Sequence, residues 1–269
     1  MKHGMIVFAM LCSTLFAAED AKFTTRPAQA ALSQKDVDYI RILPENLEAD
    51  KFYRLTMQIK MKSANIMTIG ITCGKNTAWA RTGEMPAKWQ KFCQYIAPGE
   101  AWNLYLGCVK GNTMQVKDIK LEVLNEKDFT VNLLPDYKAA GWHNAWGSKN
   151  EAKIMVTNSN DSPFGTEIIH TEIDKGTGFP AIQALPILPN RTLVVDMWVK
   201  GEPEDVWLTT LSSVVSSRFT VKKEWGKQQV KFKIPAAQKP SVAILVFWIN
   251  KLQDARMCEF GKIEAYYEE

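Results

Sequence analysis

Residues that could carry out acid–base or covalent catalysis are sparse in this 269-residue chain. Of its three histidines, only His143 and His170 lie beyond the N-terminal segment, and they are far apart in sequence. The sequence has no GxSxG, HExxH or glycine-rich phosphate-binding motif. Its acidic run GEPED, at 201–205, is typical of a solvated turn. A hydrolase would need scattered carboxylates to converge in a cleft, so we rank an enzyme below a binding protein.

Tryptophan offers a different chemistry, because its ring can stack on the apolar face of a sugar while neighbouring polar groups bond the hydroxyls. The chain contains 9 tryptophans, more than a core of this size requires. Val195, Met197 and Val199 alternate along an expected strand. Period two therefore places Asp196 and Trp198 together on the opposite face, where we predict that they contact a sugar. The alternative is that a loop or another part of the chain covers them.

Three more residues are candidate ligand contacts. Trp207 begins the next expected strand, and we predict that it lines the same face as Trp198. Trp79 and Arg81 lie in a loop-like segment between two strands, where they would contact a ligand at the rim of the fold. Packing between domains is the alternative for Trp79.

The stretch NLLPDYKAAGWHNAWGS, at 132–148, mixes aromatic residues with residues that favour turns. Its first part, 132–134, predicts the entry strand of a domain. We expect Trp142 to pack in the core of that domain. His143 and Trp146 follow in the first loop, and we predict that they are ligand contacts near the rim.

Four segments recur in the same order in the two halves of the chain. They are 52–60 and 192–200, 88–99 and 224–236, 102–109 and 241–249, and 116–124 and 258–266. When Lys60 is aligned with Lys200, the same alternating positions are apolar in both segments. Trp89 and Trp225 begin a second matching pair. Because a position shared by both copies favours a structural role, we expect both tryptophans in the core.

The elements that must position all these residues are strands. Helical patterns are nearly absent, and short alternating segments are separated by Gly, Pro and Asn, which indicates antiparallel sheets. We therefore predict an all-β fold made of two tandem antiparallel β-sandwich domains. The first domain is a diverged copy at 22–126, and the second is at 127–269. The boundary falls at the charged stretch NEKDFT.

Residues 1–21 have the charged, apolar and small-residue order of a secretory signal peptide. We expect export to the periplasm or beyond, with no transmembrane segment after processing. The net charge is +4, and Lys and Arg are not concentrated in a dense stripe along the sequence. The composition therefore argues against a nucleic-acid partner. Buried thiols are favoured over disulfides for the four cysteines beyond this segment. These are Cys73, Cys93, Cys108 and Cys258.

The second half resembles the jelly-roll carbohydrate-binding modules of families 4 and 9, which share the galactose-binding-like fold. The resemblance rests on the NLL opening, the GW that follows, a strand ending in Lys, a strand led by Trp and a closing strand. These features lie at 132–134, 141–142, 192–200, 224–236 and 258–266. The resemblance spans 132–267 and, more weakly, 31–124.

This resemblance implies that the chain binds a polysaccharide or other glycan without catalysis, with a glycoside hydrolase or a cell-surface protein as a further partner. The alternative is a structural or adhesive surface protein that uses the same fold for protein–protein contacts. The structural calcium of the family would involve Asp118 in the first copy, but Phe260 and Gly261 stand at the matched place in the second. We therefore expect no cofactor, and structural calcium is the one exception left open.

Overall fold

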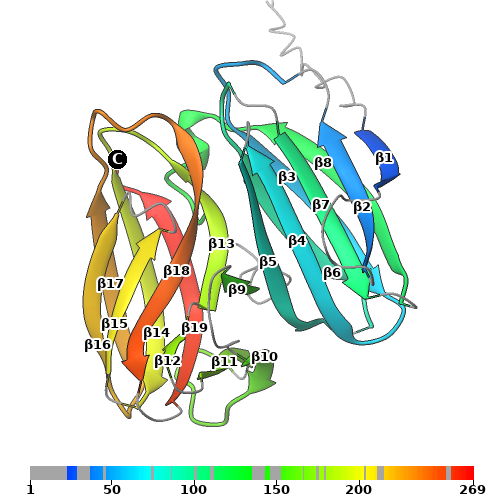
Figure 1. The fold of residues 1–269 in the computed structure, drawn as a ribbon. Coiled ribbons are helices and arrows are strands. Elements are labelled where there is room, and N and C mark those ends of the chain that lie inside the picture. Colours follow the sequence, from blue (N-terminus) through cyan, green and yellow to red (C-terminus); the bar gives the residue numbers. More distant parts are fainter. Residues whose placement is uncertain are drawn as a thin grey trace, which may run out of the picture.

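Strands make up nearly all the regular structure of the part of the chain that the computed structural model describes (Figure 1). That part comprises residues 23–28, 37–44, 47–73, 76–85, 87–99, 102–109, 112–134, 143–145, 153–165, 167–173, 176–178, 180–202, 204–210, 215–252 and 256–269. Within it the one helical element is a 3-10 turn, η1 (Glu126–Asp128). The predicted all-β class is confirmed.

We refer to the strands up to β8 as the first half and to those from β9 onward as the second half. The first half contains β1 (Phe23–Ala28), β2 (Val37–Pro44), β3 (Tyr53–Met61), β4 (Asn65–Cys73), β5 (Asn76–Met85), β6 (Gln90–Ile96), β7 (Trp102–Val109) and β8 (Met114–Val123). The second half contains β9 (His143–Ala145), β10 (Lys153–Asn158), β11 (Glu167–Ile173), β12 (Gly176–Gly178), β13 (Pro180–Ile187), β14 (Thr192–Gly201), β15 (Glu204–Thr210), β16 (Ser216–Val221), β17 (Gly226–Lys233), β18 (Ser241–Leu252) and β19 (Arg256–Tyr267).

The described strands pair antiparallel in three sheets, and the longest of these runs through both halves. Its order is β1-β2-β7-β4-β5-β9-β13-β18-β15-β16, and β12 also pairs with β18. A three-stranded sheet, β6-β3-β8, packs on the first half of the long sheet, and a five-stranded sheet, β10-β11-β19-β14-β17, packs on the second (Figure 1). Each half is therefore a sandwich of two antiparallel layers.

The four recurring segments have the same strand neighbours in both halves. In the first half β3 lies between β6 and β8, and in the second half β14 lies between β17 and β19. Both ladders contain the same irregularity. The register between β3 and β8 shifts between Thr56 and Gln58, and that between β14 and β19 shifts between Asp196 and Trp198. These positions align when Lys60 is matched with Lys200.

A left-handed residue lies at each of these bulges, and it corrects one detail of the sequence alignment. Asp118 in β8 has φ 51° and Lys262 in β19 has φ 45°, whereas most residues with a side chain avoid positive φ. The structural counterpart of Asp118 is therefore Lys262. In the two ladders Met114 corresponds to Cys258 and Val123 to Tyr267, so the alignment that set Asp118 against Phe260 is displaced by two residues along the whole strand.

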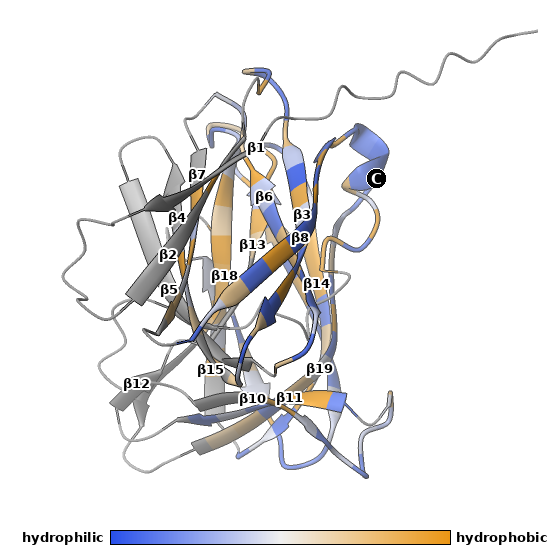
Figure 2. Ribbon diagram, turned by 90° about the vertical axis from the view of Figure 1, so that its right-hand side faces the viewer, coloured by the Kyte–Doolittle hydropathy of each residue, from blue (hydrophilic) through white to orange (hydrophobic). Residues whose placement is uncertain are grey.

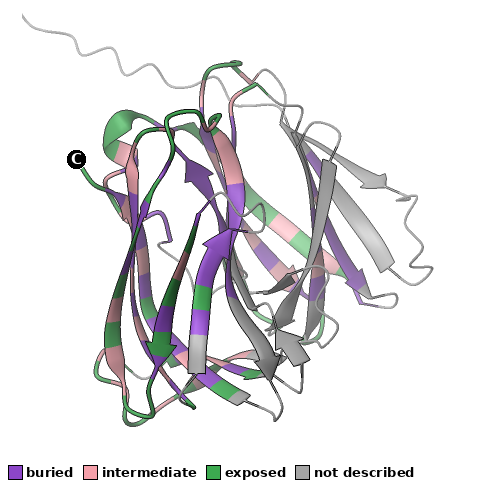
Figure 3. Cartoon of the chain, turned by 60° about the vertical axis from the view of Figure 1, so that its left-hand side comes forward, coloured by how far each residue is buried: buried purple, intermediate pink, exposed green. Residues whose placement is uncertain are grey.

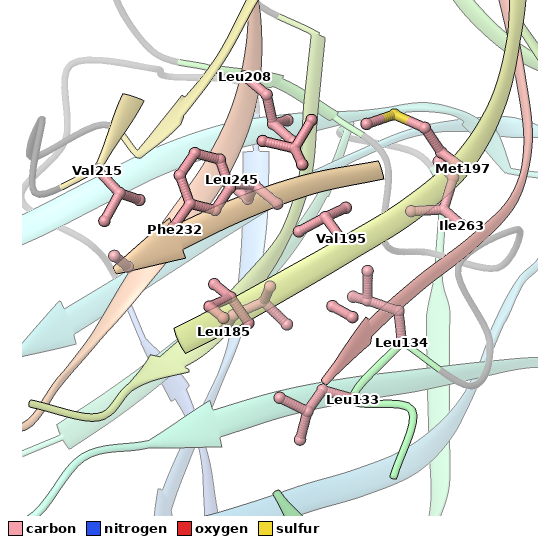
Figure 4. Close-up of a cluster of buried hydrophobic side chains, with 14 of the residues drawn as sticks. Leu133, Leu134, Leu185, Val195, Met197, Leu208, Val215, Phe232, Leu245 and Ile263 are labelled. Carbon is pink, nitrogen blue, oxygen red and sulfur yellow. The ribbon is translucent and has the colours of Figure 1, made fainter. Parts of the chain in front are cut away.

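Alternation along the strands produces the two main cores (Figure 3). In the first half Leu55, Met57 and Ile59 of β3 face the long sheet and are almost completely buried. In the second half Val195 and Met197 of β14 do the same, packed among residues of β13, β15, β17, β18 and β19 (Figure 4). The hydrophobic effect of removing these side chains from water is the main stabilising term for each sandwich.

The junction between the halves is also packed. Cys93 and Tyr95 lie on the face of β6 that is turned away from the first core, and they join the core cluster of the second half. The Tyr95 hydroxyl donates a hydrogen bond of 2.6 Å to the carbonyl oxygen of Leu133. The predicted entry strand at 132–134 is not assigned as a strand. It is nevertheless anchored beside β19, because Leu133 N–H donates to the carbonyl of Ala265 at 2.6 Å.

Candidate functional site

The outer face of the five-stranded sheet carries a group of aromatic and charged side chains that contact one another. Because Val195, Met197 and Val199 point into the core, β14 turns Asp196, Trp198 and Lys200 outward. That alternation was predicted from the sequence and is confirmed. All three outward side chains are partly buried. They form the central row of the candidate site.

A loop after β10 covers part of this row. Its Phe164 ring lies 6.1 Å from Trp198, centroid to centroid, with an angle of 34° between the two ring planes. The same ring meets Trp225 edge to face at 5.2 Å. Phe164 rests directly on Gly261 of β19, where a Cβ atom would overlap the ring. The alternative prediction, that a loop covers Trp198, is therefore correct for the part of the ring that lies beside Phe164.

One carboxylate ties this loop to the sheet. Asp161 accepts hydrogen bonds from Lys200 Nζ at 2.5 Å, from Trp225 Nε1 at 3.3 Å and from the hydroxyl of Ser159. The bond from Lys200, followed by those from Ser159 and Trp225, holds the pKa of Asp161 well below its usual range. The bond to Asp161 in turn raises the pKa of Lys200. Both groups are ionised at neutral pH.

A second set of charges continues from Lys200 towards β11. Glu259 Oε2 lies 3.6 Å from Lys200 Nζ, and its Oε1 lies 3.2 Å from Nδ1 of His170. His170 Nε2 lies 3.4 Å from Glu172. On the other side of Trp198, Asp196 accepts from Gln229 and Tyr266, each at 3.0 Å. The bond to Asp196 raises the pKa of the Tyr266 hydroxyl.

The pKa shift of Asp161 argues against a general-acid role for this one carboxylate. A glycosidase needs one carboxylic acid whose pKa is raised so that it can donate a proton. The pKa of Asp161 is shifted in the opposite direction, by a lysine that holds it as an anion. What the outer face offers a ligand is partly exposed rings for stacking and neighbouring amide, carboxylate and ammonium groups for hydrogen bonds.

The prediction that Trp207 lines the same face as Trp198 is wrong. On β15, Val206 and Leu208 point into the core of the second half, so Trp207 points out of the long sheet, where it is 41% exposed. Trp198 points out of the five-stranded sheet, on the other side of that core. The sequence could place each tryptophan relative to its own strand, but it could not tell that the two strands belong to different layers.

The remaining predicted contacts lie elsewhere or outside the described residues. Trp79 and Arg81 belong to β5, so the prediction of a loop there is wrong. In the backbone register Arg81 is opposite Asn144 of β9, and His143 is opposite Thr82. β5 and β9 thus bring Arg81 and His143 to the join between the halves. Trp142 and Trp146 lie outside the described residues.

The expectation that Trp89 and Trp225 belong to the core is also wrong. Trp89 is 36% exposed, and Lys117 Nζ lies 4.4 Å from its ring centroid. Trp225 is partly buried beside Phe164 on the outer face. The position that Trp89 and Trp225 share therefore lies on the outer surface of each sandwich, not in its core. The sequence alone does not reveal the group of Phe164, Asp161 and Lys200, because these residues converge only when the loop folds back on the sheet. For Lys200 the sequence offers one hint, which is that it aligns with Lys60 of the first half.

Among the described residues, no three His, Cys, Asp or Glu side chains are grouped as they would be around a metal ion. Cys93, Cys108 and Cys258 are buried thiols, as expected, whereas the side chain of Cys73 is not described. No helix in the described part of the chain is long and apolar enough to span a membrane.

Comparison with known proteins gives distant structural likenesses only. No protein-family model matches the sequence, and no curated protein matches it. A structure of carbohydrate-binding modules from the β-sandwich superfamily aligns over 93% of this chain and 98% of its own, with 11% identity and a TM-score of 0.32. A CBM4 structure aligns over 54% and 99%, with 12% identity and a TM-score of 0.35.

Enzymes also share this likeness. An arabinose-bound α-L-arabinofuranosidase, MgGH51, aligns over 51% of this chain with 12% identity and a TM-score of 0.38. The match spans 24% of that enzyme's length. Most of the structural neighbours are nevertheless carbohydrate-binding modules with a β-sandwich fold.

Proposed function

We propose that this chain is an exported, non-catalytic carbohydrate-binding protein that binds a glycan on the outer face of its five-stranded sheet. The observation that carries the proposal is the aromatic group of Trp198, Phe164 and Trp225, which lies between the polar pair Asp196–Gln229 and the ion pair Asp161–Lys200. Rings would stack on the apolar face of a pyranose, and the flanking groups would bond its hydroxyls.

We further propose that the chain consists of two tandem copies of one domain, at 22–126 and 127–269, following a signal peptide at 1–21. The matching ladders and the bulge at equivalent positions of both halves support the tandem copies. The resemblance to modules of families 4 and 9 supports a glycan as the ligand, with a glycoside hydrolase or a cell-surface protein as a further partner.

Two tryptophans on opposite faces supply a matched test. The purified protein would be assayed against a glycan array and against insoluble polysaccharides, and then as the variants Trp198→Ala and Trp207→Ala. Trp198→Ala should weaken binding at least about tenfold, which corresponds to a loss of about 1.4 kcal/mol. Trp207→Ala should leave it unchanged, because that ring lies across the core. Retention of full affinity by Trp198→Ala, or binding to no glycan at all, contradicts the proposal.

The second candidate function, adhesion to a protein partner, is favoured by exposed apolar side chains on two strands of the same sheet. Val156 of β10 is 49% exposed and Met257 of β19 is 37% exposed. In the strand register Val156 is aligned with Phe260 and Met257 with Lys153, so the two side chains are separate exposed apolar positions, each of which could contact a protein partner. If adhesion is the function, replacing both residues with serine should abolish attachment to the partner while Trp198→Ala has no effect.

A further inference from the structure

The equivalent strands β8 and β19 differ in what lies along their second edge. β19 pairs with β11 from Arg256 to Phe260. β8 is the edge of the three-stranded sheet, and none of the described strands pairs with its outer side. Figure 2 shows β8 crossing the front of the view, with apolar and polar segments alternating along it. Among the described strands, the three-stranded sheet therefore stops at β8, whereas the five-stranded sheet continues beyond β19 with β11 and β10.

The core under this edge is correspondingly more open. The inward side chains of β19 are almost completely buried, whereas those of β8 are only partly buried although they pack against the first core. The buried set is Cys258, Phe260, Ile263 and Ala265, and the partly buried set is Met114, Val116, Ile119 and Leu121. An added strand would cover this apolar surface in the first half, as β11 covers it in the second.

Matching hydrogen bonds show which part of β8 corresponds to the segment that β11 covers. Lys62 N–H donates to the carbonyl of Thr113 at 2.8 Å, and Glu202 N–H donates to the carbonyl of Met257 at 3.3 Å. Thr113 and Met257 therefore occupy the same place beside the central strand. The segment 113–116 of β8 is the counterpart of the part of β19 that pairs with β11.

The backbone of this segment has groups directed outward. Peptide groups of an antiparallel strand alternate between its two neighbours. Because Thr113 faces β3, the N–H and C=O groups of Met114 and Val116 face away from β3. Edge strands are normally protected by charged residues or by a bulge. On β8 these begin only at Lys117 and Asp118, so 113–116 is an uncharged and regular stretch of edge.

We propose that 113–117 of β8 pairs antiparallel with the same segment of a second copy of this chain, about a two-fold axis at Gln115. In that register Met114 of each copy is opposite Val116 of the other, which pairs apolar side chains over the open core. Gln115 is opposite itself, and Lys117 is opposite Thr113, so no like charges meet. An axis at Lys117 would instead oppose two lysines, and the bulge at Asp118 interrupts the ladder beyond it.

This interface is isologous, so it closes as a dimer and does not continue into a fibre. It would join the two three-stranded sheets into one continuous sheet across the axis. The proposal does not depend on what the outer face of the five-stranded sheet binds.

Sedimentation velocity across a dilution series tests the dimer directly. The wild-type protein should sediment as a dimer that dissociates on dilution, whereas Gln115→Lys, which places two lysines at the axis, should stay monomeric. The matched control is Ser216→Lys, which adds the same charge on the exposed edge strand β16 and should dimerise like the wild type. A monomeric wild type, or equal behaviour of the two variants, overturns the proposal.

A cross-link provides a second measurement that does not rely on weakening the dimer. Directly opposed residues in an antiparallel pair have Cα atoms close enough for a disulfide. Gln115→Cys should therefore form a covalent dimer on mild oxidation, visible on a non-reducing gel, at a protein concentration where Ser216→Cys and the wild type remain monomeric on the gel. Failure of Gln115→Cys to cross-link, while the folded protein sediments as a dimer, would place the interface elsewhere and refute this pairing.

Discussion

At the scale of single residues, Asp161 does the most to shape the candidate site. It is exposed, yet it accepts hydrogen bonds from Ser159 in its own loop and from Lys200 and Trp225 on the sheet. These bonds hold the loop against the outer face and thereby keep Phe164 beside Trp198. Exposed ion pairs contribute little to global stability. The role of Asp161 is therefore to position aromatic rings.

Asp161→Asn should lower the melting temperature slightly at neutral pH, and the difference from the wild type should narrow in acid. Because the pKa of Asp161 is lowered in the folded state, its stabilising contribution is complete above the usual carboxyl range, near pH 4. That contribution is lost as the pH falls through the lower folded-state pKa. Thermal melts of both proteins from pH 7 to pH 2 would measure this convergence. A difference that stays constant over this range contradicts the assignment.

Gly261→Ala should displace Phe164 and expose the tryptophans beside it. A Cβ atom at Gly261 would overlap the Phe164 ring, and such overpacking costs about 1–3 kcal/mol. We expect a red shift in tryptophan fluorescence together with a lower melting temperature. Gly226→Ala is the control, because its Cβ would meet only Gln228 Nε2, at 4.0 Å. If Gly261→Ala and Gly226→Ala change the tryptophan fluorescence and the melting temperature equally, Phe164 does not rest on Gly261.

At the scale of elements, period-two alternation was sufficient to locate the central strands. It predicted 52–60 and 192–200, and the structure has β3 at Tyr53–Met61 and β14 at Thr192–Gly201. Each strand has one buried face and one partly exposed face, so its burial leaves a clear trace in the sequence.

The sequence was less informative where side chains of different elements meet. Alternation correctly turned Trp198 outward, but it carries no information about which layer a strand joins, and so Trp207 was placed on the wrong face. A recurring tryptophan was interpreted as core, yet Trp89 and Trp225 recur at a surface position. The bulges were also missed, since Asp118 and Lys262 are not residues that mark a left-handed conformation as glycine does.

Lys262→Gly should be tolerated or stabilising, although glycine normally weakens a strand. A residue with a side chain pays about 1–2 kcal/mol for the left-handed conformation that Lys262 adopts, and glycine does not. This gain offsets the cost of about 0.5–1 kcal/mol for the added freedom of glycine in the unfolded chain. Lys227→Gly, at an exposed position of β17, should show only the cost. Urea unfolding of the two variants would distinguish them, and equal destabilisation would argue against the bulge.

At the scale of the whole molecule, the long sheet is two sets of strands joined edge to edge. The first half contributes β1-β2-β7-β4-β5 and the second half β9-β13-β18-β15-β16, and the join is the pairing of β5 with β9. Each set has the same neighbours in the same order. Sheet edges attract further strands, and here the chain uses one edge of each set to link its halves. The face of β6 that carries Cys93 and Tyr95 adds an apolar contact to this link.

Because side chains of β6 belong to the core of the second half, we predict that the two halves unfold as one cooperative unit. Calorimetry should show a single transition whose calorimetric and van't Hoff enthalpies agree. Tyr95→Phe removes the donor to the buried carbonyl of Leu133 and should destabilise the whole protein by about 1–3 kcal/mol. Tyr53→Phe is the control, since the Tyr53 hydroxyl accepts from Glu48 N–H within the first half.

The two variants should differ in how the single transition responds. Tyr95→Phe weakens the contact between the halves, so its transition should broaden or divide as the first half begins to unfold separately. Tyr53→Phe weakens the first half alone and leaves the contact intact, so its transition should move to lower temperature while remaining single. Two resolved transitions in the wild type would show that the packing of Tyr95 does not couple the halves, and that the continuous sheet is too weak a link to do so.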